Sequence, residues 1–122
     1  MEQTALETAV RSLDRHKAEN ILLLRVAALT AITDHFLLAS GSSAAQVRSL
    51  ADYLEEDLAK QGLVPRRSEG YAAGNWITLD YGDLLVHLFR REVRDFYDLE
   101  HLWSDAPRED ITGWLLPEDG QA

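Results

Sequence analysis

Hydrophobic residues recur with helical spacing in two stretches of the chain. Thr4 and Glu7 form a capping-box pattern ahead of the first stretch, which predicts an amphipathic helix that reaches about Lys17. Ser43 and Gln46 form the same pattern ahead of the second stretch and predict a longer helix. The apolar positions of the first helix are Leu6, Ala9, Val10 and Leu13, and those of the second are Val47, Leu50, Ala51, Leu54 and Leu58. Gly62 is expected to end the second helix.

Short apolar runs between and after these stretches predict β-strands. The expected elements are strands at 21–26, 35–39 and 66–69, a strand pair at 76–80 and 84–89, and a helix at 92–103. The 27–34 stretch joins the first two strands, either as a tight hairpin or as a longer loop. Tyr81-Gly82 predicts an antiparallel hairpin for the later pair. The predicted fold class is α/β (α+β), a two-layer mixed β-sheet with packed helices.

The C-terminal part of the chain carries few signals of regular structure. Pro107 is expected to end the regular structure, so we divide the chain into a domain at 1–105 and an acidic tail at 106–122. The tail is rich in Pro, Asp, Glu and Gly, so we expect it to be flexible. Trp114, Leu115 and Leu116 form an apolar run in this tail that could dock on the domain.

Composition narrows the class of protein. A chain of 122 residues that is 46% hydrophobic suits one globular domain. Cysteine is absent, so the sequence offers neither a disulfide nor a thiolate metal site, and a reduced cytoplasmic environment is expected. The first residues are acidic, and the longest aliphatic run covers only 21–24, so we expect neither a signal peptide nor a membrane span.

The net charge of −9 disfavours direct, non-specific binding to nucleic acid, because an acidic surface repels phosphates. A basic protein partner fits this charge better. Solubility alone explains an acidic surface equally well, so charge does not decide between the two interpretations.

Aromatic side chains are concentrated at 76–103 in a chain that is only 8% aromatic. Aromatic residues bury a large area at little conformational cost, which favours a recognition surface around Trp76 and Tyr97. The alternative is that these rings complete a small core, and for Trp103 the two interpretations are balanced. Asp80 and Asp83 flank a glycine turn, where at least one of them is expected to cap the turn.

The strongest hint of catalysis is Gly41-Ser42-Ser43, which stands between a predicted strand and a predicted helix. Free backbone N–H groups at such a junction can bind an anion. A nucleotide-transferring enzyme also needs paired carboxylates for Mg²⁺, and the sequence offers no such pair on a following strand. Helix capping by Ser43 is therefore favoured, and no catalytic residue or cofactor is predicted.

The remaining polar residues predict surface roles rather than chemistry. The histidines are scattered, without the spacing of a metal site, and His87 in a strand is expected to be satisfied and half-buried. Arg90, Arg91 and Arg94 alternate with acidic residues, which predicts a solvated, salt-bridged face rather than an RNA-binding patch.

A series of short motifs, in order along the chain, resembles the bacterial ribosomal silencing factor RsfS, the Iojap family. The motifs are Ile32-Thr33-Asp34-His35-Phe36, Ala39-Ser40-Gly41-Ser42-Ser43, Gln46-Val47, Ala51-Asp52, Gly62-Leu63, Glu69-Gly70, Trp76, Leu79-Asp80-Tyr81-Gly82-Asp83, Val86-His87 and Phe96-Tyr97-Asp98-Leu99-Glu100-His101-Leu102-Trp103. The resemblance covers roughly residues 6–105. It implies a nucleotidyltransferase-like fold that lacks the catalytic carboxylates.

The resemblance also implies a function and a site. It implies binding to the large ribosomal subunit through ribosomal protein uL14, a steric block to association with the small subunit, and repression of translation under nutrient limitation. Trp76, Tyr81 and Tyr97 match partner-facing positions of the family, and Leu99 and Trp103 share their neighbourhood. Relatives often carry an aliphatic residue where this chain has Tyr81, which keeps an apolar body and adds a hydroxyl.

Three further expectations accompany this interpretation. A minor contact with ribosomal RNA beside the protein partner is left open, as is a homodimer of the free protein that covers the aromatic surface. The alternative function is a small nucleotide-binding or nucleotidyltransferase-type enzyme on the same fold.

Overall fold

The computed structural model describes residues 1–117 of the chain. Its elements, in chain order, are α1 (Gln3–Arg15), β1 (Glu19–Arg25), β2 (His35–Gly41), α2 (Ala44–Ala59), β3 (Arg67–Glu69), β4 (Trp76–Asp80), β5 (Leu84–Arg90), α3 (Arg91–Tyr97), α4 (Leu99–Leu102) and a short 3₁₀ helix, η1 (Thr112–Trp114).

The five strands form one mixed sheet in the order β1-β2-β5-β4-β3. β2 and β5 pair in parallel, with Leu37 opposite Val86, and the other pairs are antiparallel. The predicted hairpin of β4 and β5 is confirmed, with Asp80 opposite Leu85. β1 and β2 are antiparallel neighbours, and a loop rather than a tight turn joins them. The predicted mixed α/β fold is therefore confirmed.

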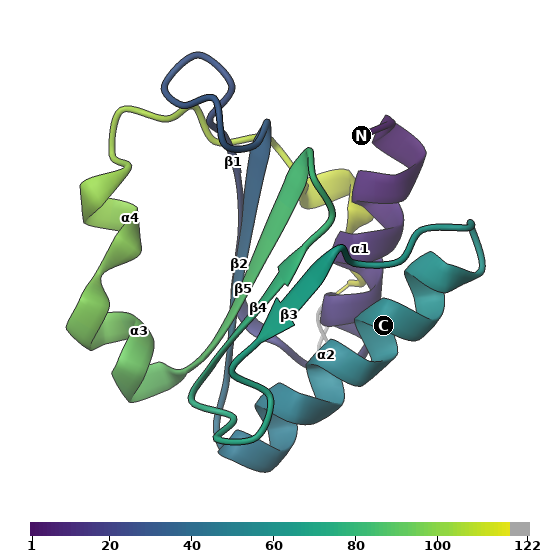
Figure 1. Ribbon diagram of the computed structural model, residues 1–122, viewed down its shortest axis with the longest axis vertical. Helices are drawn as coiled ribbons and strands as arrows, with labels where there is room; N and C mark the ends of the chain where they lie inside the picture. Colours follow the sequence, from purple (N-terminus) through teal and green to yellow (C-terminus); the bar gives the residue numbers. More distant parts are fainter. Residues whose placement is uncertain (118–122) are drawn as a thin grey trace.

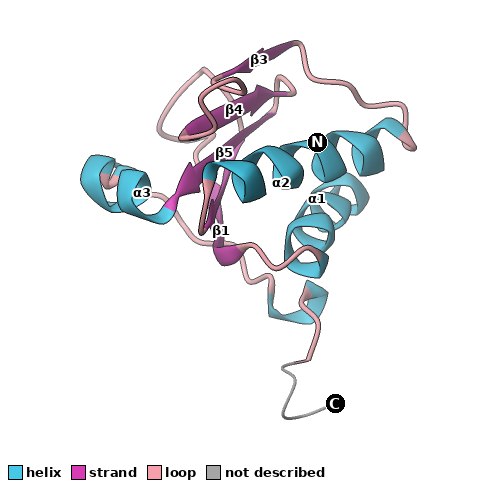
Figure 2. Cartoon of the chain, turned by 90° about the horizontal axis from the view of Figure 1, so that it is seen from below, coloured by secondary structure: helices cyan, strands magenta, loops and turns pink. Residues whose placement is uncertain are grey.

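Helices lie on both faces of the sheet. Figure 1 shows α1 and α2 on one side and α3 and α4 on the other. Alternate strand residues point to opposite faces, so Leu37, Ile77 and Val86 pack against α1 and α2, whereas Phe36 and Phe89 point toward α3 and α4. The long helices form the expected layer, which Figure 2 shows from below, and the short helices add a partial third layer.

The two predicted capping boxes have different outcomes. At α2 the prediction is confirmed, because Ser43 Oγ accepts a hydrogen bond from the Gln46 backbone N–H at 3.1 Å. At α1 it is wrong, because the helix begins at Gln3 and Thr4 already lies inside it. Glu7 instead pairs with Arg11 one turn later, at 2.8 Å. Sequence spacing allows either arrangement, since both place the carboxylate three or four residues from a partner.

The predicted helix at 92–103 is two helices. Asp98 adopts the left-handed conformation, with φ 47° and ψ 54°, and so ends α3 and starts α4 in a new direction. Neither glycine nor proline marks the break, which is why the sequence pattern did not reveal it.

The segment after residue 105 contacts the domain as far as Leu116, whose N–H donates to Asp14 Oδ2 at 2.6 Å, while the division into a domain at 1–105 and a flexible tail at 106–122 stays a prediction. The Arg25 N–H donates to the Pro107 carbonyl and the Glu109 N–H donates to the Leu23 carbonyl, so the chain runs along the free edge of β1. Ala106 and Ile111 are buried. Trp114, part of the run that could dock on the domain, packs against the core on the α1 side. The rest of the predicted tail, 118–122, lies outside the described residues.

Candidate functional site

Trp76 is the centre of an aromatic cluster on the α3–α4 face of the sheet. It begins β4 and is half-buried, and its indole ring lies 4.9 Å from the Phe89 ring and 4.9 Å from the Tyr97 ring, measured between centroids. These distances are typical of interacting aromatic pairs. The sheet therefore holds one side of the indole in place while Tyr97 of α3 covers another.

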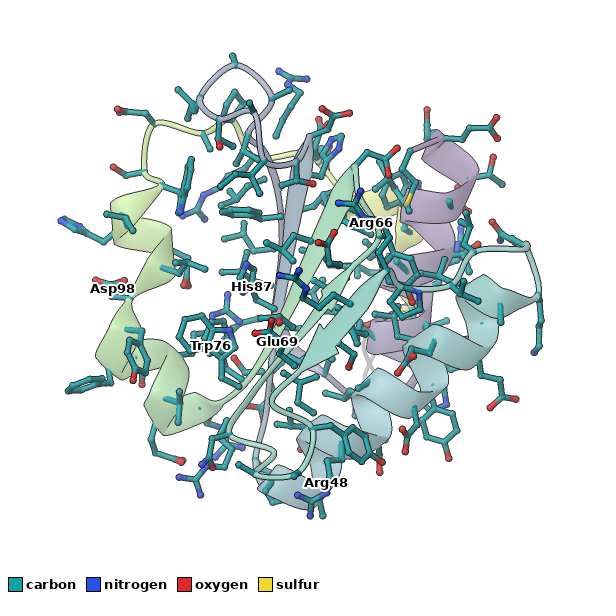
Figure 3. All side chains as sticks on the ribbon, in the orientation of Figure 1. Arg48, Arg66, Glu69, Trp76, His87 and Asp98 are labelled. Atoms are coloured by element: carbon teal, nitrogen blue, oxygen red, sulfur yellow. The ribbon has the colours of Figure 1, made fainter. Side chains whose placement is uncertain are left out.

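His87 fixes the orientation of Trp76. The Trp76 Nε1–H donates to His87 Nδ1 at 3.1 Å, and Figure 3 shows both side chains on the side of the sheet that faces α3 and α4. Because an indole nitrogen only donates, His87 Nδ1 must be unprotonated and the imidazole neutral. Burial agrees with this assignment, since it lowers the pKa of His87 to about 4. His87 Nε2 has no hydrogen-bond partner among the described residues. The prediction of a half-buried histidine with both nitrogens bonded is therefore wrong, because His87 is buried and only Nδ1 is bonded.

The two short helices extend the cluster outward. Tyr97 is 55% exposed at the end of α3. Leu99, the first residue of α4, and Trp103, which follows its last residue, are half-buried. The Trp103 ring meets the Phe36 ring edge-on at 4.9 Å, so Trp103 serves the core more than the surface. The structure thus brings four of the predicted site residues together, namely Trp76, Tyr97, Leu99 and Trp103.

Two apolar side chains outside the predicted site are the most exposed of this region. Phe96 in α3 is 80% exposed and Leu102 in α4 is 75% exposed. A single continuous helix would have given different solvent-facing positions, so no signal in the sequence distinguished them. We define the aromatic surface as Trp76, Phe96, Tyr97, Leu99 and Leu102.

The other predicted site residues lie at the β4–β5 turn. Asp80 Oδ1 accepts from the Gly82 N–H at 2.8 Å, which confirms the predicted turn cap. Tyr81 packs against the core on the α1–α2 side, and burial together with nearby Glu55 raises its pKa. Asp83 pairs with the amino group of Met1. These three residues are therefore not part of the aromatic surface.

The loop at Gly41-Ser42-Ser43 satisfies its own polar groups. Gln46 Oε1 accepts from the Ser42 N–H at 2.6 Å and from Ser42 Oγ at 2.8 Å, while Ser43 caps α2. The backbone N–H groups of Ser42 and Gln46 are thus engaged, and the predicted cap of α2 by Ser43 is confirmed. Over residues 1–117, no cluster of three or more His, Asp or Glu side chains could hold a metal ion. In the same range, no helix has the length and apolar character needed to cross a bilayer.

The arginines near the site divide into exposed and buried ones. Arg91 pairs with Glu19 and Arg90 with Glu92 on the surface, as the salt-bridged face predicted. Arg94 departs from that prediction, because it is only 6% exposed and lies between α3 and the sheet. A buried guanidinium requires partners, and Ser40 and Glu100 supply them.

These features define a small α/β domain that displays an aromatic surface on two short helices. The family model described as "Ribosomal silencing factor during starvation" (RsfS) matches residues 1–122. The chain belongs to this family, which confirms the resemblance noted in the sequence. The likeness to nucleotidyltransferases stays a prediction.

Individual relatives agree with the family match. A ribosomal silencing factor RsfS from Halalkalibacterium halodurans is 38% identical over 111 residues, covering 91% of this chain and 95% of the relative. A crystal structure of a Chromobacterium violaceum protein has a TM-score of 0.82 at 35% identity, covering 85% of this chain and 88% of that one. A mouse protein named "Mitochondrial assembly of ribosomal large subunit protein 1" is 29% identical over 121 residues, covering 93% of this chain and 53% of the relative.

Proposed function

We propose that the protein binds the large ribosomal subunit through ribosomal protein uL14 and sterically blocks association with the small subunit, which represses translation under nutrient limitation. The family description supports the silencing role. The name of the mouse relative supports the choice of the large subunit. The proposal places the protein in the cytoplasm, where bacterial ribosomes work.

The observation that carries this proposal is the aromatic surface. Phe96 of α3 and Leu102 of α4 expose 80% and 75% of their area, and the Phe96 ring meets the half-exposed Tyr97 ring edge-on at 5.1 Å. Clustered large apolar side chains on a small domain mark an interaction site, and aromatic residues are the commonest anchors of protein interfaces. We propose that Trp76, Tyr97 and Leu99, with Phe96 and Leu102, contact uL14.

Charge complements these anchors. Asp95 and Asp98 are exposed on and between the two short helices, and the chain carries a net charge of −9. Ribosomal proteins are generally basic, so opposite charges would speed the encounter while the apolar contacts slow dissociation. A minor contact with ribosomal RNA and a homodimer of the free protein remain predictions.

The mode of action we propose is occupancy rather than catalysis. Purified protein is titrated against isolated large subunits, small subunits are added, and joined ribosomes are separated by sedimentation. We expect inhibition to saturate at one protein per large subunit, without nucleoside triphosphate, and to disappear when the protein is washed off.

A matched pair of variants ties this inhibition to the site. Tyr97→Ala removes a ring of the aromatic surface, whereas Tyr53→Ala removes a 44% exposed ring of α2 on the opposite side of the sheet. We expect the first variant to lose inhibition and the second to keep it. Silencing that persists after removal of substoichiometric protein would instead indicate an enzyme that modifies the ribosome.

A further inference from the structure

Arg94 makes polar contacts that join both short helices to the sheet. Its Nη1 donates to Ser40 Oγ of β2 at 2.9 Å, and its Nε donates to Glu100 Oε2 of α4 at 3.1 Å. Ser40 is 1% exposed, and the Arg94 side chain is 7% exposed. One guanidinium therefore contacts three elements at once: α3 that carries it, α4 and the sheet.

The pair of Arg94 and Glu100 depends on the bend at Asp98. In a continuous α-helix, two residues six positions apart are separated by about 240° around the axis and about 9 Å along it, so their side chains cannot meet. The left-handed conformation of Asp98 turns the chain and brings Glu100 back beside Arg94. Figure 3 shows Asp98 at this bend, on the far side of α3 and α4 from the sheet. The ion pair therefore requires the bend.

Energetics favour a role in geometry over a role in stability. A buried ion pair is weak evidence for net stability, because desolvation offsets much of the attraction. Its directional hydrogen bonds, however, permit few arrangements of the groups that they join, and a planar guanidinium fork defines two directions at once. Helices of seven and four residues are too short to hold their own shape, so tertiary contacts must set their angle.

We propose that Arg94 is a positioning residue that fixes α4 against α3, so that Phe96 and Tyr97 on one helix and Leu99 and Leu102 on the other form a single preformed surface. This inference rests on the proposed function, because the surface that Arg94 positions is the proposed binding site. We call Arg94 with its partners Ser40 and Glu100 the clamp. A preformed surface loses less conformational entropy when it binds, so the clamp raises affinity without touching the partner.

Three variants and one control test the clamp. Arg94→Lys keeps the charge but cannot reach both partners with a rigid fork, Arg94→Met removes the charge, and Glu100→Gln keeps an acceptor while removing its charge. Arg91→Met is the matched control, because Arg91 lies in the same helix and pairs with Glu19 at an exposed site. Circular dichroism and thermal unfolding first establish which variants are folded.

The first measurement is amide hydrogen exchange of the free protein, resolved over 96–103. We expect Arg94→Lys to speed exchange in this segment about tenfold while exchange in α1 and α2 is unchanged. Glu100→Gln should have a smaller effect in the same segment, and Arg91→Met should behave as the parent. Exchange at the parental rate in Arg94→Lys overturns the clamp, and this result stands even if Arg94→Met does not fold.

The second measurement is affinity for isolated large subunits at a temperature where every variant used is folded. We expect Arg94→Lys to bind about tenfold more weakly than the parent and Arg91→Met to bind within about twofold of it. Faster exchange with parental affinity would make Arg94 a purely structural residue and overturn its role in binding. If the parent itself does not bind large subunits, the proposed function fails, while the exchange data still decide whether the clamp exists.

Discussion

The two faces of the sheet are built on different principles. On one face, α1 and α2, with 13 and 16 residues, bury long apolar stripes against the strands. On the other face, α3 and α4 have only 7 and 4 residues, and the sheet presents buried polar side chains, Ser40 and His87, beneath them. The first face supplies most of the hydrophobic core, and the second supplies the most exposed rings, those of Phe96 and Tyr97.

This difference indicates a division of labour between stability and recognition. Short helices on a small cluster of contacts open more easily than long helices on a broad apolar core. Interaction sites tolerate this, because the energy of binding compensates for a lower local stability. We therefore expect changes on the α1–α2 face to affect unfolding and changes on the α3–α4 face to affect binding.

The largest effect is expected when a buried side chain on the α1–α2 face is truncated. Leu54 of α2 is fully buried, so Leu54→Ala should lower the free energy of unfolding by about 2 to 5 kcal/mol through lost burial and a residual cavity. Affinity for large subunits, measured at a temperature where the variant is folded, should stay at the parental value. The free energy is read from urea denaturation. A folded Leu54→Ala variant that binds weakly would show that the two faces are coupled.

The next effect concerns pH and the opposite face. Burial lowers the pKa of His87 to about 4, below the value of about 6.5 that a histidine has in an unfolded chain. The neutral form is thus favoured in the folded state, and its stabilising contribution is present above pH 6.5. As pH falls toward 4, the unfolded chain binds a proton that the folded chain does not, and the free energy of unfolding decreases by about 3 kcal/mol.

A non-titrating variant isolates this contribution, because carboxylates also titrate near pH 4. His87→Gln can still accept the Trp76 hydrogen bond through its amide oxygen. We expect its stability to fall less than that of the parent between pH 6.5 and 4.5, as measured by urea denaturation at each pH. Parallel curves for the two proteins would show that His87 is readily protonated in the folded state.

The third effect is on binding to large subunits. Trp76→Ala and Tyr97→Ala should each weaken binding to large subunits by about 2 kcal/mol or more, roughly 30-fold, because each removes a central aromatic anchor. Tyr97→Ala should change the free energy of unfolding by no more than about 0.5 kcal/mol, since the ring is 55% exposed. Surface plasmon resonance on immobilised subunits gives the affinities. Parental affinity in both folded variants would place the contact elsewhere.

Sequence patterns predicted the face that follows simple periodicity. The stripe of Val47, Leu50 and Leu54 gave α2, and the Ser43 cap gave its start, because burial of one apolar side dominates there. The β4–β5 hairpin was equally visible from its turn residues. Three of the residues that define the aromatic surface, Trp76, Tyr97 and Leu99, were also selected in advance.

The opposite face was harder to predict because its features break local rules. Asp98 ends a helix without glycine or proline, and Arg94 is buried although arginine is usually exposed. The burial of Arg94 depends on Glu100 and Ser40, which become its neighbours only in the folded chain. Phe96 and Leu102 could not be identified as exposed until the bend between the helices was known.

A smaller effect is expected at the bend itself. A non-glycine residue in the left-handed conformation costs about 1 kcal/mol, so Asp98→Gly should be more stable than Asp98→Ala by about this amount. Both variants remove the same carboxylate, which makes each the control for the other. The difference is measured by urea denaturation. Equal stabilities would show that the α3–α4 joint can relax to another conformation.

The smallest effect separates Tyr81 from the aromatic surface. Its hydroxyl is buried without a partner among the described residues, and the ring packs on the α1–α2 side of the sheet. Burying an unpaired hydroxyl is unfavourable, so Tyr81→Phe should raise the free energy of unfolding by up to about 1 kcal/mol. Because the ring faces away from Trp76 and Tyr97, affinity for large subunits should not change. Weaker binding by Tyr81→Phe would instead extend the partner contact around the β4–β5 turn to the α2 side, as the family resemblance of this position implies.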